Sequence, residues 1–457
     1  MARNRFSLGN MAREDDEVNA DLTPEQGEAA VDEIVESPAE DIAEADQLAG
    51  ELDEIVDGIG EVVGDAEELE GVADAIDATK AEGGVSAPAA EALNLMLNIV
   101  AKRHGIPLTG SFSRESFDSK TSRVKATEGL VDRVKDTANT IWKWLQKAYE
   151  KAKAWVIKWF NKFFDGATKL KDRAEKLEKL AKQKSGKTYN GTDKLDNTSM
   201  AEALADTSGK VPSGSQLTAA FGLLSKEVES GKAADLVDVF TKAAESITDQ
   251  IGDEKKLAGI LKQTIKDLIS SGTVGKVKDG DDDVKYVIME ELLGGRCFAI
   301  TVKDEQGDDI EELADALASI RGGIHVLVNA QVPKSGELPY LGAAECASLA
   351  GAIKDIATKL INSKNRLKKV EEGCNRVITA AKRQEARTAK GEDSDDTVAR
   401  SKAARRALSG LVTYITAGVA LERQEILRVG NISLNYTAAS LGKLGTKEEK
   451  KNEKDIS

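Results

Sequence analysis

The side chains that most often carry catalysis or bind metal ions are sparse in this chain of 457 residues. The two histidines and three cysteines lie far apart in the sequence: His104, His325, Cys297, Cys346 and Cys374. Zinc sites and disulfide frameworks need closer and paired spacings, and an odd number of cysteines suits a reducing interior. We therefore expect no metal site, no cofactor and no histidine base, and we predict that the protein is not an enzyme.

Two short sequences resemble parts of ligand-binding loops but lack required positions. Residues 185–188, Ser-Gly-Lys-Thr, match the end of a phosphate-binding loop. That loop needs an earlier glycine, where this chain has Ala181, and a preceding strand, where this chain has a lysine-rich helical pattern. The run from Gly280 to Asp283 lacks the spaced ligands and the distal glutamate of a calcium loop. We interpret the first sequence as a linker and the second as a solvated turn.

A third pattern concerns proteolysis: a small residue, any residue, then Glu. It ends at Glu115, directly before Ser116, in a stretch with Pro, Gly and Ser between two helical patterns. The same pattern also ends at other positions, among them Glu68, Glu91 and Glu345. We predict cleavage after Glu115, with Glu91 as a second site. The alternative is that this stretch is an ordinary linker between domains.

The position of Glu115 divides the chain by charge. The whole chain has 64 Lys and Arg against 79 Asp and Glu, a net charge of −15. Residues 1–115 carry a net −21, and residues 116–457 carry a net +6 with basic ends, +10 over 116–190 and +7 over 364–457. A uniformly acidic chain would be repelled by nucleic acid, whereas lysine-rich ends attract phosphate. The asymmetry therefore indicates a basic body behind an acidic front.

One long amphipathic helix, from about residue 126 to 166, carries all four tryptophans. At 100° per residue its apolar side chains fall in an arc of about 160°, and lysines occupy the other side. The aromatic members of the arc are Trp142, Trp144, Trp155, Trp159, Phe160 and Phe163. The candidates for phosphate contact are Lys143, Lys147, Lys151, Lys158 and Lys162. A shorter helical pattern follows Gly166.

Three roles stay open for the aromatic face of this helix. It can pack in a core, insert into a membrane surface opposite the lysine face, or stack on bases. Stacking is disfavoured, because a platform for single strands interleaves aromatic residues with lysines and this helix separates them. The lysine face can contact phosphate while the aromatic face packs.

The remaining patterns predict a mainly α-helical fold. We expect a helical bundle-like body, a small α+β region with a hairpin plus one strand, and a weakly ordered acidic arm that buries little area. Gly294-Gly295 between two β-rich runs predicts the hairpin, and a helix over 311–320 precedes the third strand. The predicted segments are an acidic arm or propeptide (1–115), basic aromatic helices (116–184), a linker (185–216), a helical region (217–275), the α+β region (276–340), C-terminal helices (341–442) and a charged tail (443–457).

Membrane-spanning and secreted classes are disfavoured by the distribution of apolar residues. No uncharged apolar run approaches the roughly 18 residues that a membrane span needs, and the first residues lack the apolar stretch of a secretory signal. We expect a cytosolic or particle-bound protein.

The layout resembles that of the internal head, or prohead core, proteins of large tailed bacteriophages. The features that carry the resemblance are the acidic arm rich in Ala and Glu, the small-x-Glu site before Ser116 and the basic helical remainder. Members of that group assemble with the scaffold inside the immature capsid, are trimmed by a prohead protease after a short motif ending in Glu, and stay packed with the DNA. The resemblance covers the first half of the chain best and implies cleavage at Glu115 and Glu91. It does not reach the strands within 284–333.

The resemblance implies a structural protein of the capsid interior, made in the host cytoplasm and present in many copies or as an oligomer. Its implied partners are other virion proteins, capsid or scaffold subunits, packaged DNA and the prohead protease. The acidic arm would keep the basic body from binding nucleic acid early, and its removal would leave a body of net charge +6. Two alternatives stay open: a membrane-active or DNA-co-injected effector that uses the Trp/Lys helix, and an unprocessed scaffold-type subunit.

Overall fold

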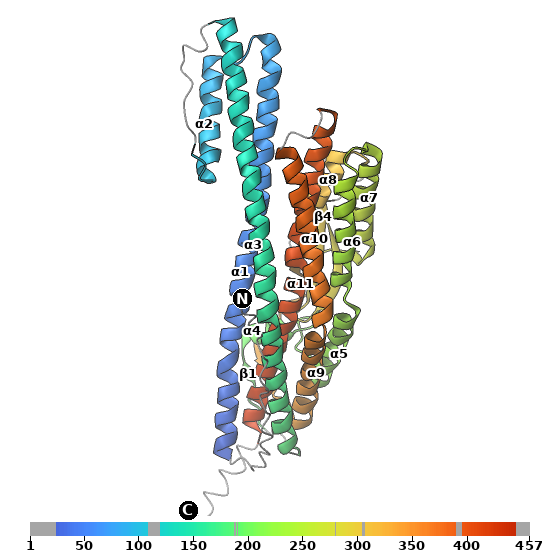
Figure 1. The fold of residues 1–457 in the computed structure, drawn as a ribbon. Helices are drawn as coiled ribbons and strands as arrows, with labels where there is room; N and C mark the ends of the chain where they lie inside the picture. The colour runs from blue at the N-terminus through green and yellow to red at the C-terminus, as the bar shows by residue number, and fades with distance from the viewer. Residues whose placement is uncertain are drawn as a thin grey trace, which may run out of the picture.

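The computed structural model describes residues 24–107, 119–186, 189, 191–278, 280–303, 307–389 and 395–444. Over these residues the fold is mainly α-helical, as the sequence predicts. Three long helices run along the length of the molecule: α1 (Pro24–Ala78), α3 (Lys120–Gln183) and α11 (Asp395–Lys443) (Figure 1). The other helices and a small sheet pack around them.

Helix α3 contains the predicted aromatic helix and continues without a break through Gly166. It begins at Ser119, whose hydroxyl accepts a hydrogen bond from the Ser122 backbone N–H. Its buried side chains recur every three or four residues, which places them on one face of the helix. That face packs against α1, α11 and the helices α9 (Ala343–Asn362) and α10 (Lys364–Ala389).

Helix α1 departs from the expectation that the acidic segment buries little area. Over its second half Leu52, Ile59 and Leu69 are each 1% exposed or less. The expectation failed because small residues such as Ala66 and Ala73, both fully buried, let neighbouring helices approach closely. The weakly apolar face of α1 is therefore long enough to form part of the core with α3 and α11.

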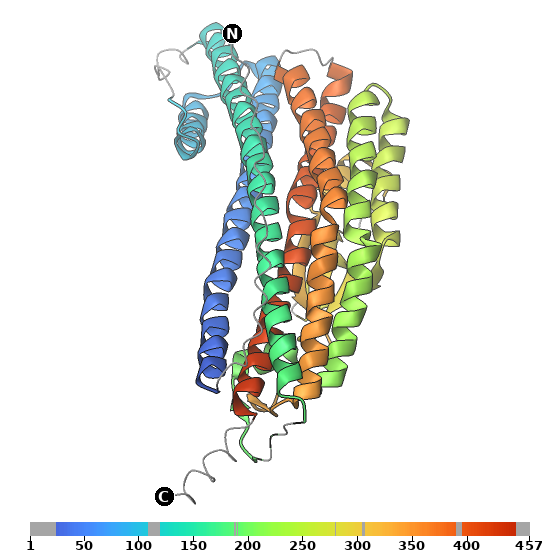
Figure 2. The same ribbon diagram turned by 60° about the horizontal axis from the view of Figure 1, so that its bottom comes forward.

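The acidic segment then turns back along α3. After a short 3₁₀ helix, η1 (Thr79–Glu82), the Val85 backbone N–H donates to the Thr127 hydroxyl of α3 at 3.0 Å. Helix α2 (Ala87–Arg103) follows, lying beside the ends of α1 and α3 (Figures 1 and 2). Residues 24–107 thus form a folded helical hairpin.

The remaining helices pack around α9, α10 and α11. They are α4 (Thr198–Leu204), α5 (Gly214–Ser230), α6 (Lys232–Asp249), α7 (Glu254–Ser270) and α8 (Ile310–Ala318). Figure 2 shows α6 beside α10 and α7 outermost, and the contacts of α5 with α9, of α6 with α10 and of α7 with α6 agree. Helix α11 contacts most of these elements and is the centre of the bundle.

A small antiparallel sheet lies against α8 and α11. Its order is β2 (Thr273–Gly275), β3 (Val284–Leu292), β4 (Arg296–Lys303) and β5 (Arg321–Val326). The predicted hairpin is confirmed: Gly294 and Gly295 join β3 to β4 with φ of 76° and 63°, values that favour glycine. The third predicted strand is β5, whereas β2 was not predicted. A further pair, β1 (Leu195–Asp196) with β6 (Glu337–Leu338), completes the strands among the described residues.

Glycine lets the smaller elements approach α11 closely. A side chain at Gly410 would collide with the Leu317 carbonyl at the end of α8, and the Gly322 backbone of β5 lies against Gly418. The sheet thereby turns its Phe298, Ile300 and Val302 face into the main core. These contacts set the position of α11 against which the acidic segment packs.

Candidate functional site

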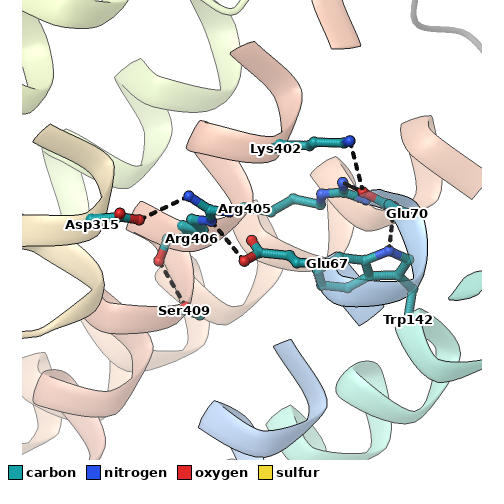
Figure 3. A network of polar contacts seen from close by, with 8 residues as sticks. All are labelled: Glu67, Glu70, Trp142, Asp315, Lys402, Arg405, Arg406 and Ser409. Atoms are coloured by element: carbon teal, nitrogen blue, oxygen red, sulfur yellow. Dashed lines mark hydrogen bonds and ion pairs between the residues drawn. The ribbon is translucent and has the colours of Figure 1, made fainter. Parts of the chain in front are cut away.

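The acidic helix α1 meets basic side chains of α11 in a group that we name the α1–α11 cluster. Its members are Glu67, Glu70, Lys402, Arg405 and Arg406 (Figure 3). The Arg406 Nε lies 2.6 Å from a Glu67 oxygen, and an Arg405 Nη lies 2.8 Å from a Glu70 oxygen. The side chain of Lys402 lies between two acidic partners, 3.0 Å from Asp74 and 3.9 Å from Glu70. Carboxylates of the acidic segment therefore neutralise consecutive basic residues of α11.

Helix α3 takes part in the same cluster through Trp142. The Trp142 indole N–H donates to Glu70 at 2.7 Å, and the Arg405 guanidinium lies 4.1 Å from the centre of the Trp142 ring (Figure 3). The Arg405 side chain is only 1% exposed. A charge this deeply buried is tolerated when an opposite charge is paired with it. The cluster therefore joins all three long helices.

The other arginine of the cluster connects α1 to α8. Arg406 also lies 2.9 Å from Asp315 of α8, so one guanidinium bridges two carboxylates (Figure 3). Burial raises the pKa of the Glu67 carboxyl, and the neighbouring Arg406 offsets this only in part. The position of α1 is therefore coupled to the position of α8 and, through it, to the sheet.

A second, exposed ion pair joins the acidic segment to the predicted lysine face of α3. The Lys158 ammonium lies 2.6 Å from Glu51, and this hydrogen bond lowers the pKa of the Glu51 carboxyl. The other predicted phosphate contacts are distributed along α3: Lys143, Lys147 and Lys151 are exposed, and Lys162 is half-buried. Lys147 lies 4.4 Å from the centre of the Trp144 ring. Among the lysines predicted to contact phosphate, Lys158 is thus paired with a carboxylate of the acidic segment.

The predicted aromatic residues lie mostly inside the bundle. Five of the six are at most 7% exposed: Trp142, Trp155, Trp159, Phe160 and Phe163. Their rings contact one another, as Trp159 and Phe163 do at 5.0 Å between centres. Trp144 differs, with 37% of its surface exposed. In the described ranges, no helix combines the length and the apolar character that crossing a bilayer requires.

The predicted cleavage positions fall in two different settings. Glu115 and Ser116 lie outside the described residues, as do Lys187 and Thr188 of the loop-like sequence. Glu91 is exposed on α2. The run from Gly280 to Asp283, for which a solvated turn is predicted, is exposed. Within it the Asp283 backbone N–H donates to the Asp281 carboxylate.

The cysteines and histidines occupy structural positions. All three cysteines are free and buried, and burial raises the pKa of the thiols of Cys297, Cys346 and Cys374 to about 11, 12 and 12. His104 lies 2.7 Å from Asp65, and the ring of His325 contacts that of Tyr286. Across the part of the chain that the structure describes, no group of three or more potential metal-binding side chains occurs.

Another buried group of charges, which we name the β3–α11 cluster, consists of Glu290, Glu422 and Arg423. Their side chains are 6%, 4% and 1% exposed. No donor within the described residues lies at hydrogen-bond distance from either Glu290 oxygen, and Arg423 donates to the Val228 carbonyl at 3.4 Å. Burial, and then the neighbouring Glu422, raises the pKa of Glu290 to about 9. Glu290 is therefore protonated at neutral pH.

The sequence reasoning did not find either cluster. A usable signal exists for the first: the run Arg400 to Arg406 holds four basic residues, and the run Glu67 to Asp74 holds four acidic residues. Neither run shows that the two meet, because about 330 residues separate them.

The chain matches the family model for phiKZ-like phage internal head proteins over residues 13–439. Searches of curated proteins and of solved structures gave no significant match. The match extends through the α+β region, which the resemblance in sequence layout did not reach. The location inside the phage head that the layout implied is thereby supported for the chain as a whole. Because the matched range covers nearly the whole chain, the protein belongs to the phiKZ-like phage internal head proteins.

Proposed function

We propose that this protein is a DNA-associated structural component of the head interior, in which the acidic segment neutralises basic residues until it is removed during maturation. The α1–α11 cluster carries the proposal. In it, carboxylates of the acidic segment form ion pairs with Lys402, Arg405 and Arg406 of the same chain. The segment therefore acts as an internal counter-charge for a body that is otherwise net basic.

The physical consequence concerns phosphate binding. While α1 is bound, Lys158, Lys402 and Arg406 pair with carboxylates and attract phosphate weakly. Removal of the acidic segment frees Lys158 and Lys402, leaves Arg406 with Asp315 as its remaining partner, and changes the net charge from −15 to +6. Binding to DNA would then be independent of sequence and steeply dependent on salt, because it releases counterions from the phosphates.

Mass spectrometry of proheads and of mature heads tests the proposal. We expect the intact chain in proheads and a chain beginning at Ser116 in mature heads. Crosslinking with formaldehyde before digestion should then place DNA adducts on α3 lysines such as Lys143 and Lys151 in mature heads and not in proheads. An intact N-terminus in mature heads would contradict the removal of the segment.

A second candidate function is that of an unprocessed structural subunit with a permanent acidic segment. The burial of the apolar face of α1 favours it, because Leu52, Ile59 and Leu69 belong to the main core. The same measurement separates the two: mature heads that contain the intact chain, without DNA adducts on α3, would support the unprocessed subunit.

A further inference from the structure

The contact between α1 and the rest of the chain has the composition of a protein core. Seven large apolar residues on the second half of α1 are at most 9% exposed: Leu52, Val56, Ile59, Val62, Val63, Leu69 and Ile76. They belong to the same apolar cluster as Trp142 and Trp155 of α3 and Leu408 of α11. Burial of apolar surface on this scale is typical of permanent contacts rather than of a segment that binds through charge alone.

The second helix of the acidic segment is also fixed in place. Asp65 of α1 is 7% exposed and lies 2.6 Å from Arg103 and 2.7 Å from His104 at the end of α2. Leu97 and Val100 of α2 are buried in the main core. Residues 24–107 therefore hold their own hairpin together with contacts that do not cross residues 108–118.

The α1–α11 cluster adds a cost to separation. If α1 left, Arg405 would lose Glu70 while still lying over the Trp142 ring, and Trp142 would lose its acceptor. Separation would therefore give up an ion pair and an indole hydrogen bond that are screened little by water or salt. Water can reach the exposed Lys158–Glu51 pair, so salt weakens that contact far more than the buried cluster.

We propose that residues 24–107 stay bound to the body as a separate chain after a single cut between residues 108 and 118, held by the apolar face of α1 and by the α1–α11 cluster. This inference rests on the proposed function, since that function calls for the segment to be removed. Removal then takes a second event that unwinds α1. The small-x-Glu sequence ending at Glu68 lies within α1 beside the fully buried Ala66, so a protease that needs an extended substrate reaches it only after unwinding.

An engineered cut in the full-length protein tests the inference. A recognition sequence for a site-specific protease is placed between residues 108 and 118, and the cut protein is analysed by size-exclusion chromatography and native mass spectrometry. At about 1 µM protein, a complex survives only if its dissociation constant is well below that concentration. We expect the two fragments to elute together as a 1:1 complex at about 0.15 M and at about 1 M NaCl, where screening is nearly complete. An acidic fragment that elutes alone at the lower salt would overturn the inference.

A matched pair of variants tests the role of the cluster. In the cut protein, Glu67→Gln with Glu70→Gln should raise the rate at which a labelled acidic fragment exchanges by about tenfold or more, since the buried Arg405 loses its counter-charge and Arg406 keeps only Asp315. The control, Glu61→Gln with Glu68→Gln, removes two exposed carboxylates of the same helix and should change the rate less than about twofold. Equal exchange rates in the two variants would contradict the role given to the cluster. Elution of both uncut variants like the wild type confirms that they fold.

The two proposals fail in distinguishable ways. Because the cut is engineered, the result in vitro does not depend on whether cleavage after Glu115 occurs in the head. A failure of the proposed function appears as an intact N-terminus in mature heads. A failure of this inference appears as a free acidic fragment after the engineered cut.

Discussion

The two buried groups of charges on α11 differ in how their members are paired. In the α1–α11 cluster, Glu67 and Glu70 each lie within 2.8 Å of a guanidinium nitrogen. In the β3–α11 cluster, two carboxylates lie side by side with one arginine, and no donor reaches the Glu290 oxygens within the described residues. The first cluster is neutralised by opposite charge, whereas the second is neutralised by a proton on Glu290.

This difference indicates separate roles for the first turns and for the middle of the same helix. Pairing of opposite charges joins α1, α3, α8 and α11, so the acidic segment is bound by contacts that persist over a wide range of pH. Protonation of a like-charged pair couples the β3–α11 contact to pH. Four variants, ordered by the size of their effect, test this comparison.

The largest effect is expected for Arg405→Met, which removes the most deeply buried cation of the α1–α11 cluster. We expect the free energy of unfolding to fall by about 3–5 kcal/mol, because Glu70 is left largely buried with only Trp142 and Lys402 beside it. Urea unfolding at pH 7 measures the change.

The control for this substitution is Arg376→Met on α10. Arg376 is 55% exposed and lies 3.8 Å from Glu245, so its loss should cost less than about 1 kcal/mol. If the two arginines had equal effects, burial would not distinguish the cluster from an ordinary surface ion pair.

The second effect is expected for Glu290→Gln, which replaces the proton-dependent carboxyl by an amide. The pKa of Glu290 is raised from 4.5 to about 9 by burial and then by Glu422, with Arg423 opposing and Glu227 adding to the rise. The folded state therefore keeps a proton that the unfolded state has lost. The contribution of Glu290 to the free energy of unfolding is therefore greatest below about pH 4.5. It falls by up to about 1.4 kcal/mol per pH unit as the pH rises toward 9.

Glutamine removes this dependence, because it carries no proton to lose. We expect Glu290→Gln to raise the free energy of unfolding by about 2 kcal/mol at pH 7 and to flatten its decline between about pH 5 and 9. Urea unfolding over a series of pH values measures both. Glu291→Gln, at the exposed neighbour on β3, should leave the decline unchanged. A decline that persists in Glu290→Gln would show that another group carries the pH dependence.

A smaller effect is expected for Trp142→Phe, which keeps an aromatic ring but removes the indole N–H. The variant loses the 2.7 Å hydrogen bond to Glu70 and part of the attraction between the ring and Arg405. Together these should lower the free energy of unfolding by about 1–2 kcal/mol. Trp144→Phe, at the tryptophan that is 37% exposed, should change it by less than about 0.5 kcal/mol. Equal losses of unfolding free energy in the two variants would show that Trp142 makes no special contribution to the cluster.

The sequence predicted the elements whose information is local. The apolar arc of α3 follows from helical spacing alone, and residues from Leu130 to Phe163 are buried as that arc indicates. Gly294 and Gly295 specify their turn by conformation, so the hairpin was found as well. Strand β2 has three residues, too few for a pattern to appear, and it exists because β3 supplies its hydrogen bonds.

The candidate site was less accessible from the sequence because its contacts join distant parts of the chain. Glu70 and Arg405 are 335 positions apart, and each looks like one of many surface charges until α1 packs on α11. The burial of α1 has the same origin: Ala66 and Ala73 bury little area each, and only a complementary long helix makes such a face part of a core. The net charges of the segments therefore predict the acidic segment and the basic regions of the body, but not which residues pair.

The smallest effect is expected for Lys158→Met, which breaks the exposed ion pair with Glu51. With side chains 45% and 32% exposed, the pair should contribute no more than about 0.5 kcal/mol at low salt. The contribution should vanish at about 1 M NaCl, because the screening length falls to about 3 Å. Lys151→Met, at an exposed lysine of the same helix, is the control for loss of a positive charge alone. If Lys158→Met instead cost as much as Trp142→Phe, and did so at both salt concentrations, an exposed pair would hold α1 as firmly as the buried cluster. The contrast between buried and exposed contacts of the acidic segment would then be wrong, and with it the reason to expect that salt alone leaves α1 in place.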